Sequence, residues 1–589
     1  MGALLTLVTW ALALGVVLLL GLPWTLGPKR AGNRRVSLAR LRFSLWIGLA
    51  VAFLVILITN VVVPIRSPAA ALVGATVVAT SLVVLVALRP RLSVRVASAR
   101  LPAILVSTLG VLVVVYLAIV AMGPVTNYDS GLYHIGAIRY SGDYATIPGL
   151  ANVYQAFGYN NSQFPFAAAF TNGPWGIEGL RLANGFLILL AMVDLILRWW
   201  SKRRGRAAWI MLVSSAVLAI PMIGLADYWV TSPTSDSAVF TLSIVAATYL
   251  VEVLVSHGRR ARGSIAVVVV TSVLILTMRP TMALYALLLV LIAMAVLIKR
   301  RKILTRSESL PLLFSVLIAA ALVGTQIVRD RLLSGWLMYP LSVLPFDVPW
   351  RALDPVNTRL STLGAARDPE NYLAATEGWE WVGPWVSRLP SMWEVYAWAV
   401  LLLFVLLLLV IRRWQGQRGL WSGTLAAAML PAGVAVLAWW ALSPPSFRFI
   451  WGPMFVLLAI PAGWLLYGIA KRGVGARDIS VGVTLVILVV IAGVTAFTLV
   501  FRVNWPAWTA EQAFTVGPLT LPYTFAPVKD APVEDVEMPS GLVLLRPIES
   551  DQCWMTYPLC TPLIEAEVMP RGSLADYPTG IGDGFTYRG

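Results

Sequence analysis

Apolar runs of about 20 residues recur from residue 3 to residue 501, and they constrain the fold more than any other feature of the sequence. A helix of that length crosses the roughly 30 Å hydrocarbon layer of a membrane. Hydrophobic residues make up 59% of the 589 residues and charged residues only 12%, a ratio that excludes an ordinary water-soluble core. The sequence therefore predicts an all-α polytopic membrane protein.

We predict fourteen membrane-spanning helices from these runs. Their approximate positions are residues 3–22, 43–65, 69–88, 101–122, 181–199, 207–226, 238–256, 264–278, 281–298, 309–328, 395–411, 420–441, 451–470 and 479–501.

Basic residues gather in alternate connections between the predicted helices. These connections, which hold more than half of the 45 Lys and Arg residues, cover residues 29–42, 89–100, 198–206, 259–262, 299–306, 412–418 and 471–477. Positive charge next to membrane spans marks the cytoplasmic side, so both chain ends are expected outside the cytoplasm. The first apolar run lacks a basic leader and a small-residue cleavage site, which predicts a span and not a removed signal peptide. The net charge of +17 is thus explained by topology, and no nucleic-acid partner is expected.

The opposite side holds three long polar segments, at residues 123–180, 329–394 and 502–589. We expect the chemistry to take place there, at the cell membrane but outside the cytoplasm, on substrates that are exported or carried by lipids. The chain divides into extra N-terminal helices (1–100), a catalytic membrane domain (101–501) and a C-terminal domain (502–589).

The C-terminal segment contains both cysteines of the chain, Cys553 and Cys560. An oxidising compartment favours a disulfide between them, although both could stay reduced, and a zinc site would need more ligands. The stretches LTLPYTF and GLVLLRP, among many Pro and Gly, predict a small β-rich extracytoplasmic cap.

The first long loop carries the sequence NYDSGLYHIGAIRYSGD. Asp129 follows the fourth span closely, at a depth where a carboxylate meets both water and lipid headgroups. Apolar residues then recur at helical spacing, which predicts a short interfacial helix whose polar side carries Tyr133, His134 and Arg139. Taken alone, Asp129 is better explained as the N-cap of this helix than as a catalytic residue.

These features resemble the GT-C superfamily of integral membrane glycosyltransferases. The matching features are Asp129 in NYDSGLYH, the amphipathic stretch after it, and the alternation of short cytoplasmic turns with long outer loops. The motifs NYDSGLYH, PGLAN, YNNS, DQCW and PLCTP are similar to those of a largely uncharacterised group of bacterial GT-C-like membrane proteins, over roughly residues 101 to 570. The chain departs from the usual pattern because three spans precede the matching first helix and because Asp129 has no adjacent acid.

The resemblance implies a hexosyl- or pentosyltransferase of the cell envelope that uses a polyprenyl-phosphate-linked sugar. Asp129 would be the general base that takes the proton of an acceptor hydroxyl on a glycan, lipid or protein, with inversion at the anomeric carbon. A divalent metal is left open, and no metal-ligand set is predicted.

Two arginines are candidates for binding the donor phosphate, namely Arg448 in SPPSFRFIW and Arg279 in TMRPTMALY. Snorkelling to the membrane surface would explain each equally well. Asp236 is a second acid, a metal ligand or an N-terminal helix charge. Asn160 and Asn161 are candidates for binding sugar hydroxyls, and they also begin an N-N-S glycosylation sequon.

Two other functions stay open. A lipid-linked saccharide flippase or transporter should carry charged or broken helices deep in the membrane, whereas these spans look nearly free of charge except for Asp194 and Arg198, which we expect to pair. An oligosaccharide ligase or polymerase acting on a lipid pyrophosphate differs mainly in its donor. The many outer Trp residues are interpreted first as an aromatic belt at the membrane surface.

Overall fold

The computed structural model of the chain describes residues 1–26, 35–93, 100–202, 204–300, 310–353, 355–371, 374–416, 422–472, 476–564, 567–573 and 579–587. Parts of the predicted basic connections, at residues 29–34, 94–99, 203, 301–306, 417–418 and 473–475, therefore lie outside the described residues.

Among the described residues, fourteen helices are long and apolar enough to cross a membrane, which confirms the predicted spans and marks the chain as a multi-pass membrane protein. They are α1 (Gly2–Leu26), α2 (Leu38–Val62), α3 (Pro68–Leu88), α4 (Leu101–Val120), α7 (Leu182–Trp200), α8 (Arg206–Gly224), α10 (Ser235–Val255), α11 (Gly258–Met278), α12 (Ala283–Lys299), α13 (Leu310–Leu333), α16 (Trp393–Trp414), α17 (Gly423–Leu442), α18 (Trp451–Arg472) and α19 (Ala476–Phe501).

Serine residues fix where several of these helices begin. The hydroxyl oxygen of Ser37 accepts the backbone N–H of Arg40 at the start of α2, and Ser67 does the same for Ala70 in α3. These N–H groups have no partner within the helix, so a side-chain acceptor stabilises the first turn. A polar residue immediately before an apolar run thus sets the helix boundary.

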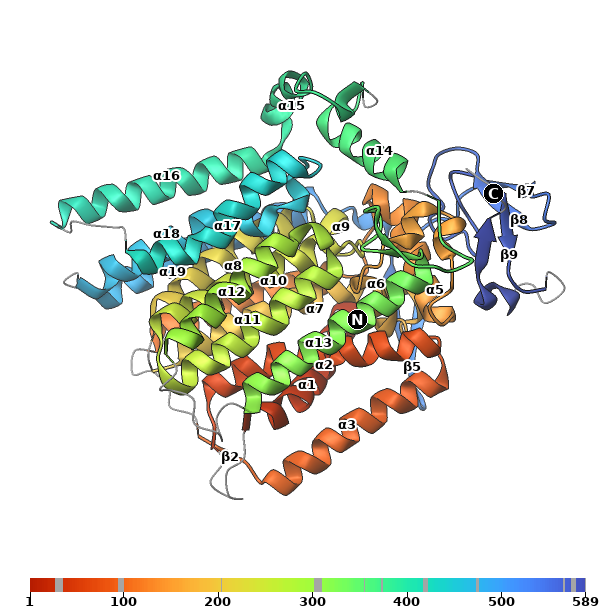
Figure 1. The fold of residues 1–589 in the computed structure, drawn as a ribbon. Helices are drawn as coiled ribbons and strands as arrows, with labels where there is room; N and C mark the ends of the chain where they lie inside the picture. Colours follow the sequence, from red (N-terminus) through yellow and green to blue (C-terminus); the bar gives the residue numbers. More distant parts are fainter. Residues whose placement is uncertain are drawn as a thin grey trace.

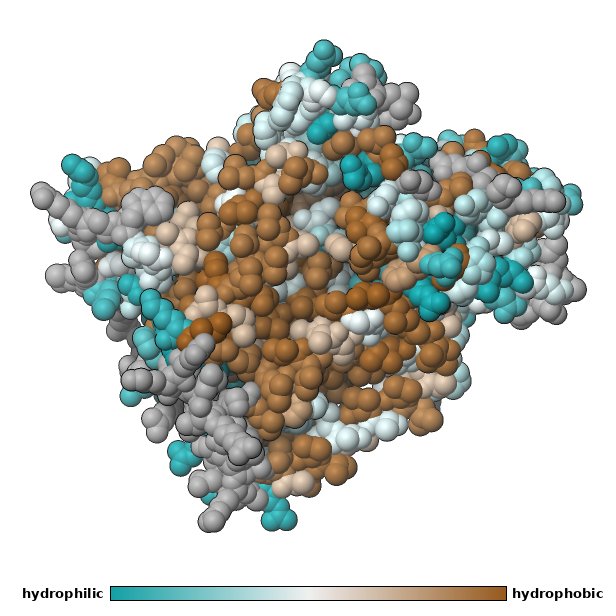
Figure 2. Space-filling view, viewed as in Figure 1, coloured by the Kyte–Doolittle hydropathy of each residue, from teal (hydrophilic) through white to brown (hydrophobic). Residues whose placement is uncertain are grey.

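The helices form an inner and an outer set. In the apolar 18-residue stretch of α10, 89% of the residues are buried inside the protein, whereas in the corresponding stretch of α3 only 6% are buried. Figure 1 shows the helices as one inclined bundle with α3 set apart along its side, and Figure 2 shows a broad apolar belt across this face. Apolar side chains exposed on such a scale are what a lipid-facing surface requires.

The long polar segments meet at one end of this bundle (Figure 1). They include the short helices α5 (Ile135–Asp143), α6 (Gln163–Phe170), α14 (Val356–Arg367) and α15 (Val382–Arg388). The short helix α9 (Ala226–Trp229), in the connection between α8 and α10, is hydrogen-bonded to the first of these segments. The backbone N–H of Phe585 donates to Pro148 at 2.9 Å, and Asn152 Nδ2 donates to the carbonyl of Trp350 at 3.1 Å. The first loop, the second loop and the tail are therefore one packed layer.

The predicted interfacial helix after Asp129 is present, but it is enclosed by protein. A π-helical turn (Ser130–His134) leads directly into α5, and His134 is only 3% exposed. The expectation that His134 lies on an open polar side was wrong, because α6 and the tail cover this helix.

The tail is β-rich, as predicted. It forms antiparallel pairs between β5 (Ala510–Val516) and β6 (Leu519–Phe525), between β7 (Val533–Glu537) and β8 (Val543–Pro547), and between β9 (Val568–Pro570) and β10 (Phe585–Tyr587). Shorter pairs join β1 (Arg35–Val36) to β2 (Arg91–Leu92) and β3 (Trp336–Leu337) to β4 (Val343–Pro345).

Charged side chains from three of the inner helices form one buried cluster. Arg198 Nε donates to Asp194 at 2.5 Å, which confirms their predicted pairing, and Arg198 Nη1 donates to Glu252 at 2.7 Å. Arg42 of α2 makes two further bonds to Glu252. These residues lie in the terminal turns of three helices and neutralise one another there, while the apolar stretches of the described spans hold at most two charged residues each, as predicted.

Candidate functional site

The centre of the candidate site is an ion pair between Asp129 and Arg448. Arg448 Nη1 donates to Asp129 Oδ2 at 2.8 Å, and the two side chains are 18% and 28% exposed, Asp129 being the less exposed. Asp129 stands directly before the π-helical turn but makes no capping hydrogen bond with its side chain. The carboxylate is therefore held by an arginine 319 residues away in the chain, and simple N-capping does not explain it.

Arg448 lies in a short 3₁₀ turn (Phe447–Phe449) between α17 and α18. Two buried tryptophans hold this turn, because Trp385 Nε1 donates to the carbonyl of Pro445 at 3.0 Å and Trp439 Nε1 donates to that of Ser446 at 3.1 Å. The interpretation of every outer Trp as part of a membrane-surface belt was wrong for these two, which position the Arg448 turn from inside the protein.

A second ion pair lies beside the first. Arg279 pairs with Asp236, which is 3% exposed near the start of α10. Arg279 Nη1 also donates to the backbone carbonyl of Arg448 at 3.3 Å. Both guanidinium groups pack on the ring of Phe449, with centroid distances of 4.8 Å for Arg279 and 5.1 Å for Arg448. The two predicted phosphate-binding arginines thus share one aromatic ring and one stretch of backbone.

The surroundings of Arg448 keep its side chain protonated and positively charged. Burial opposes that charge, but the carboxylates of Asp129 and Asp236 outweigh it and raise the pKa of Arg448 above its ordinary value. A permanently charged planar group at this position is suited to bind an oxyanion through two oxygens at once.

Tyr133 and His134 form the wall next to Asp129. Their rings lie 4.5 Å apart, and Tyr133 also contacts the ring of Tyr159 at 5.5 Å. Burial lowers the pKa of His134 to about 4, and its Nδ1 shares a hydrogen bond of 3.2 Å with Ser130 Oγ. Burial also raises the pKa of Tyr133 well above its usual range. Both side chains are therefore uncharged at neutral pH.

Three of the predicted binding residues lie elsewhere. Arg139 donates to the carbonyl of Met555 and packs on the ring of Tyr557 at 4.2 Å, so it anchors the tail. Asn160 accepts a hydrogen bond from Arg329 at 3.0 Å, and Asn161 lines a separate cavity. None of the three has a contact with Asp129 or Arg448 among the described residues.

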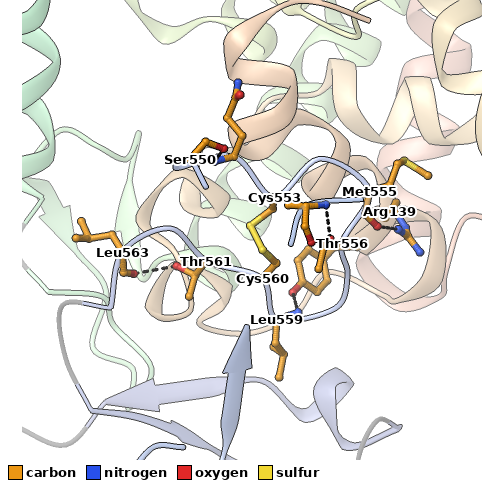
Figure 3. The surroundings of a disulfide bond; sticks show 12 residues. Arg139, Ser550, Cys553, Met555, Thr556, Leu559, Cys560, Thr561 and Leu563 are labelled. Atoms are coloured by element: carbon orange, nitrogen blue, oxygen red, sulfur yellow. Dashed lines mark hydrogen bonds between the residues drawn. A yellow bond between two sulfur atoms is a disulfide. The ribbon is translucent and has the colours of Figure 1, made fainter. Parts of the chain in front are cut away.

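The tail covers the Asp129 turn through the loop between its two cysteines. Cys553 and Cys560 form the predicted disulfide (Figure 3). Next to Cys553, Trp554 donates its backbone N–H to the carbonyl of Gly131 at 2.9 Å, and Gln552 Nε2 donates to that of Tyr128 at 2.9 Å. The disulfide loop and the residue just before it are thus bonded to residues on both sides of Asp129.

The residues at the site do not form a metal-ligand set. Asp129 and Asp236 each face an arginine, and no cluster of three His, Cys, Asp or Glu side chains occurs in the part of the chain that the structure describes. Divalent cations in proteins prefer several oxygen ligands together. We therefore derive no step through a metal.

Comparison with curated proteins gives no match to this chain. A family model does match, over residues 3–455, a span that runs from α1 into α18 and includes Asp129, Arg279 and Arg448. The chain therefore belongs to the family described as a domain of unknown function, DUF8201.

Proposed function

We propose that this protein is a membrane glycosyltransferase of the GT-C type, which transfers a sugar from a polyprenyl-phosphate donor to a hydroxyl of an extracytoplasmic glycan, lipid or protein. The observation that carries the proposal is the Asp129–Arg448 ion pair with Arg279 beside it. A carboxylate and two guanidinium groups at one place are what a general base and a leaving phosphate require.

The reaction forms a bond between the acceptor oxygen and the anomeric carbon while the bond from that carbon to the phosphate oxygen breaks. The acceptor proton passes to Asp129, and the electron pair of the broken bond stays on the phosphate. Arg448 and Arg279 stabilise the growing negative charge of this phosphate, which needs little protonation to leave. A single displacement of this kind inverts the anomeric centre.

Each uncharged neighbour also has a part in this scheme. His134 and Tyr133 stay neutral, so they compete neither with Asp129 for a proton nor with the arginines for the phosphate. The ring of Phe449 packs against both guanidinium groups and covers one side of each. The disulfide loop of the tail is bonded to the backbone beside Asp129, and residues 1–100 supply the three helices that precede the GT-C-like part.

The test is sugar transfer by the full chain in lipid nanodiscs with radiolabelled polyprenyl-phosphate sugars and an envelope fraction as acceptor. Asp129→Asn should reduce turnover by about 10²-fold or more, the usual contribution of a general base, while donor binding persists.

The matched control is Asp143→Asn, because Asp143 lies on the same helix segment and also pairs with an arginine, Arg66. Equal losses in both variants, or most activity retained in Asp129→Asn, would contradict the proposal. Movement of the lipid-linked sugar across vesicles without covalent transfer would favour a transporter, and transfer only from pyrophosphate donors would favour a ligase or polymerase.

A further inference from the structure

The hairpin directly after the span α13 contains an exposed apolar strand. Strand β3 pairs with β4 (Val343–Pro345), and all three residues of β4 are exposed. Leu344 is 66% exposed and Val343 is 45% exposed. Consecutive exposed apolar residues are disfavoured in a segment that faces only water. Strand β4 therefore needs an explanation of its own.

The hairpin is packed against the protein on both sides of β4. In the turn before β4, Tyr339 is 5% exposed, and its ring lies 6.1 Å from the ring of Tyr159. Directly after β4, Phe346 donates its backbone N–H to the carbonyl of Gly335 at 2.9 Å. The strand is thus held at both ends, and its exposed side chains are not those of a loose loop.

Leu344 stands at a backbone position that does not favour leucine. Its φ angle of 48° lies in the left-handed region, which glycine and asparagine enter more easily than residues with larger side chains. Because the side chain is mostly exposed, contacts within the protein do little to offset this cost. A partner outside the chain would supply the missing apolar contacts.

Strand β4 adjoins the lipid-facing surface of the bundle. Exposed apolar side chains extend along α13 as far as Ile327 and Val328, and the next exposed residue is the charged Arg331. The apolar surface of this span therefore ends just before the hairpin begins. In the view shared by Figures 1 and 2, the apolar belt reaches the area where the segment between α13 and α14 is drawn. This position corresponds to the headgroup region of one membrane leaflet.

The residues that flank the hairpin are of the types found at membrane surfaces. Arg331 and Arg351 are exposed, and the guanidinium of Arg351 lies 5.8 Å from the centre of the Trp336 ring. Trp350 Nε1 donates to the carbonyl of Arg331 at 2.9 Å. One exposed carboxylate, Asp347, lies between the two arginines, so the exposed charge of this stretch is positive overall. Arginine and tryptophan side chains suit the zone of lipid phosphates and glycerol groups.

We propose that the β3–β4 hairpin is a membrane anchor, in which the apolar side chains of β4 insert into the headgroup region of the adjoining leaflet. The partner is the phospholipid bilayer itself, at a depth of about 5–10 Å from its surface. The anchor fixes the height of the packed polar layer above the membrane. It does not rest on the proposed function, because no residue of the Asp129–Arg448 cluster takes part in it.

The experiment places a fluorescent label on β4 of the full chain in phospholipid nanodiscs. Both natural cysteines are joined in the disulfide, so Leu344→Cys offers a single free thiol for a nitrobenzoxadiazole label. The matched control is Ile548→Cys, at a residue that is 59% exposed and follows β8, which lies away from the bundle in Figure 1. The quencher is a phospholipid with a spin label near the headgroup end of its acyl chain.

The label in Leu344→Cys should be quenched by this lipid at least about 2-fold more strongly than the label in Ile548→Cys, because only an interfacial residue lies within reach of the acyl chains. Iodide, which stays in water, should quench the two labels in the opposite order. Val343→Cys repeats the measurement on the neighbouring side chain and keeps the test available if Leu344→Cys does not fold.

No transfer assay enters this test, so its result is independent of whether the proposed function holds. Equal lipid quenching of the labels on β4 and in Ile548→Cys, or stronger iodide quenching on β4, would overturn the anchor and point to a partner in water. Stronger quenching of β4 by a lipid labelled at the far end of its acyl chain would overturn the assignment to the headgroup region.

Discussion

Replacing Gly131 with alanine tests whether the tail is packed against the Asp129 turn. A Cβ at this position would lie 2.6 Å from Cε2 and 2.7 Å from Cδ2 of Trp554. Ordinary carbon contacts are about 3.5–4.0 Å, so one partner must move by roughly 1 Å. Trp554 cannot move freely, because it follows the bridged Cys553 and its backbone is bonded to Gly131 itself.

We expect Gly131→Ala to destabilise the contact by about 1–3 kcal/mol, the usual cost of inserting a methyl group into packed structure. The assay is the temperature at which the purified protein unfolds in detergent, together with the rate at which protease releases the tail. The control is Gly142→Ala in the same helix, where the added Cβ meets only the flexible end of Arg66 and should cost little.

A double-mutant cycle that combines Gly131→Ala with Trp554→Ala makes the prediction sharp. Once the indole ring is absent, the added methyl group has room, so the second change should recover about 1–3 kcal/mol of the loss. If Gly131→Ala is as stable as the natural protein, or if the two substitutions are simply additive, the tail is not seated on this turn.

Three further predictions follow from other contacts. The neutral, buried His134 has a pKa of about 4 against 6.5 when unfolded, so the unfolded state binds more protons between these values. Stability should therefore fall by about 3 kcal/mol as the pH drops from 6.5 to 4, and pH-dependent unfolding of His134→Phe should lack this slope. Glu252→Gln removes one of the two carboxylates that pair with the buried Arg42 and Arg198, so that both arginines share Asp194 alone, and it should cost about 3–5 kcal/mol, whereas the exposed control Glu511→Gln should cost almost nothing in the same thermal melts. Cys553→Ser opens a ring of about eight residues and should cost about 2–3 kcal/mol, which loosens the tail but leaves the bundle folded; bundle unfolding together with tail release would show that this division is wrong.

The parts of the fold that hydropathy controls were predictable from the sequence. All fourteen spans lie where apolar length places them, although α13 continues to Leu333, so that Arg329 and Asp330 belong to a helix and not to the loop. The disulfide was also predictable, because the two cysteines stand seven positions apart and have no other cysteine to pair with.

The site was predictable only as a set of separate residues. Asp129, Arg279 and Arg448 could each be chosen from their place at the end of a span, but nothing in the sequence pairs Asp129 with a residue 319 positions later. Asn160 could not be placed from the sequence, since only the folded chain shows that it accepts a hydrogen bond from Arg329 of α13.

The central claim is that Arg448 and Arg279 bind the donor phosphate next to Asp129. The most direct measurement is an experimental structure of the full chain with a bound polyprenyl phosphate. We expect the phosphate within hydrogen-bonding distance, about 3 Å, of the Arg448 guanidinium, with Arg279 as its second partner and Asp129 facing the side of the phosphate that the sugar of the donor would occupy. A phosphate bound elsewhere while the Asp129–Arg448 pair stays closed would contradict the claim.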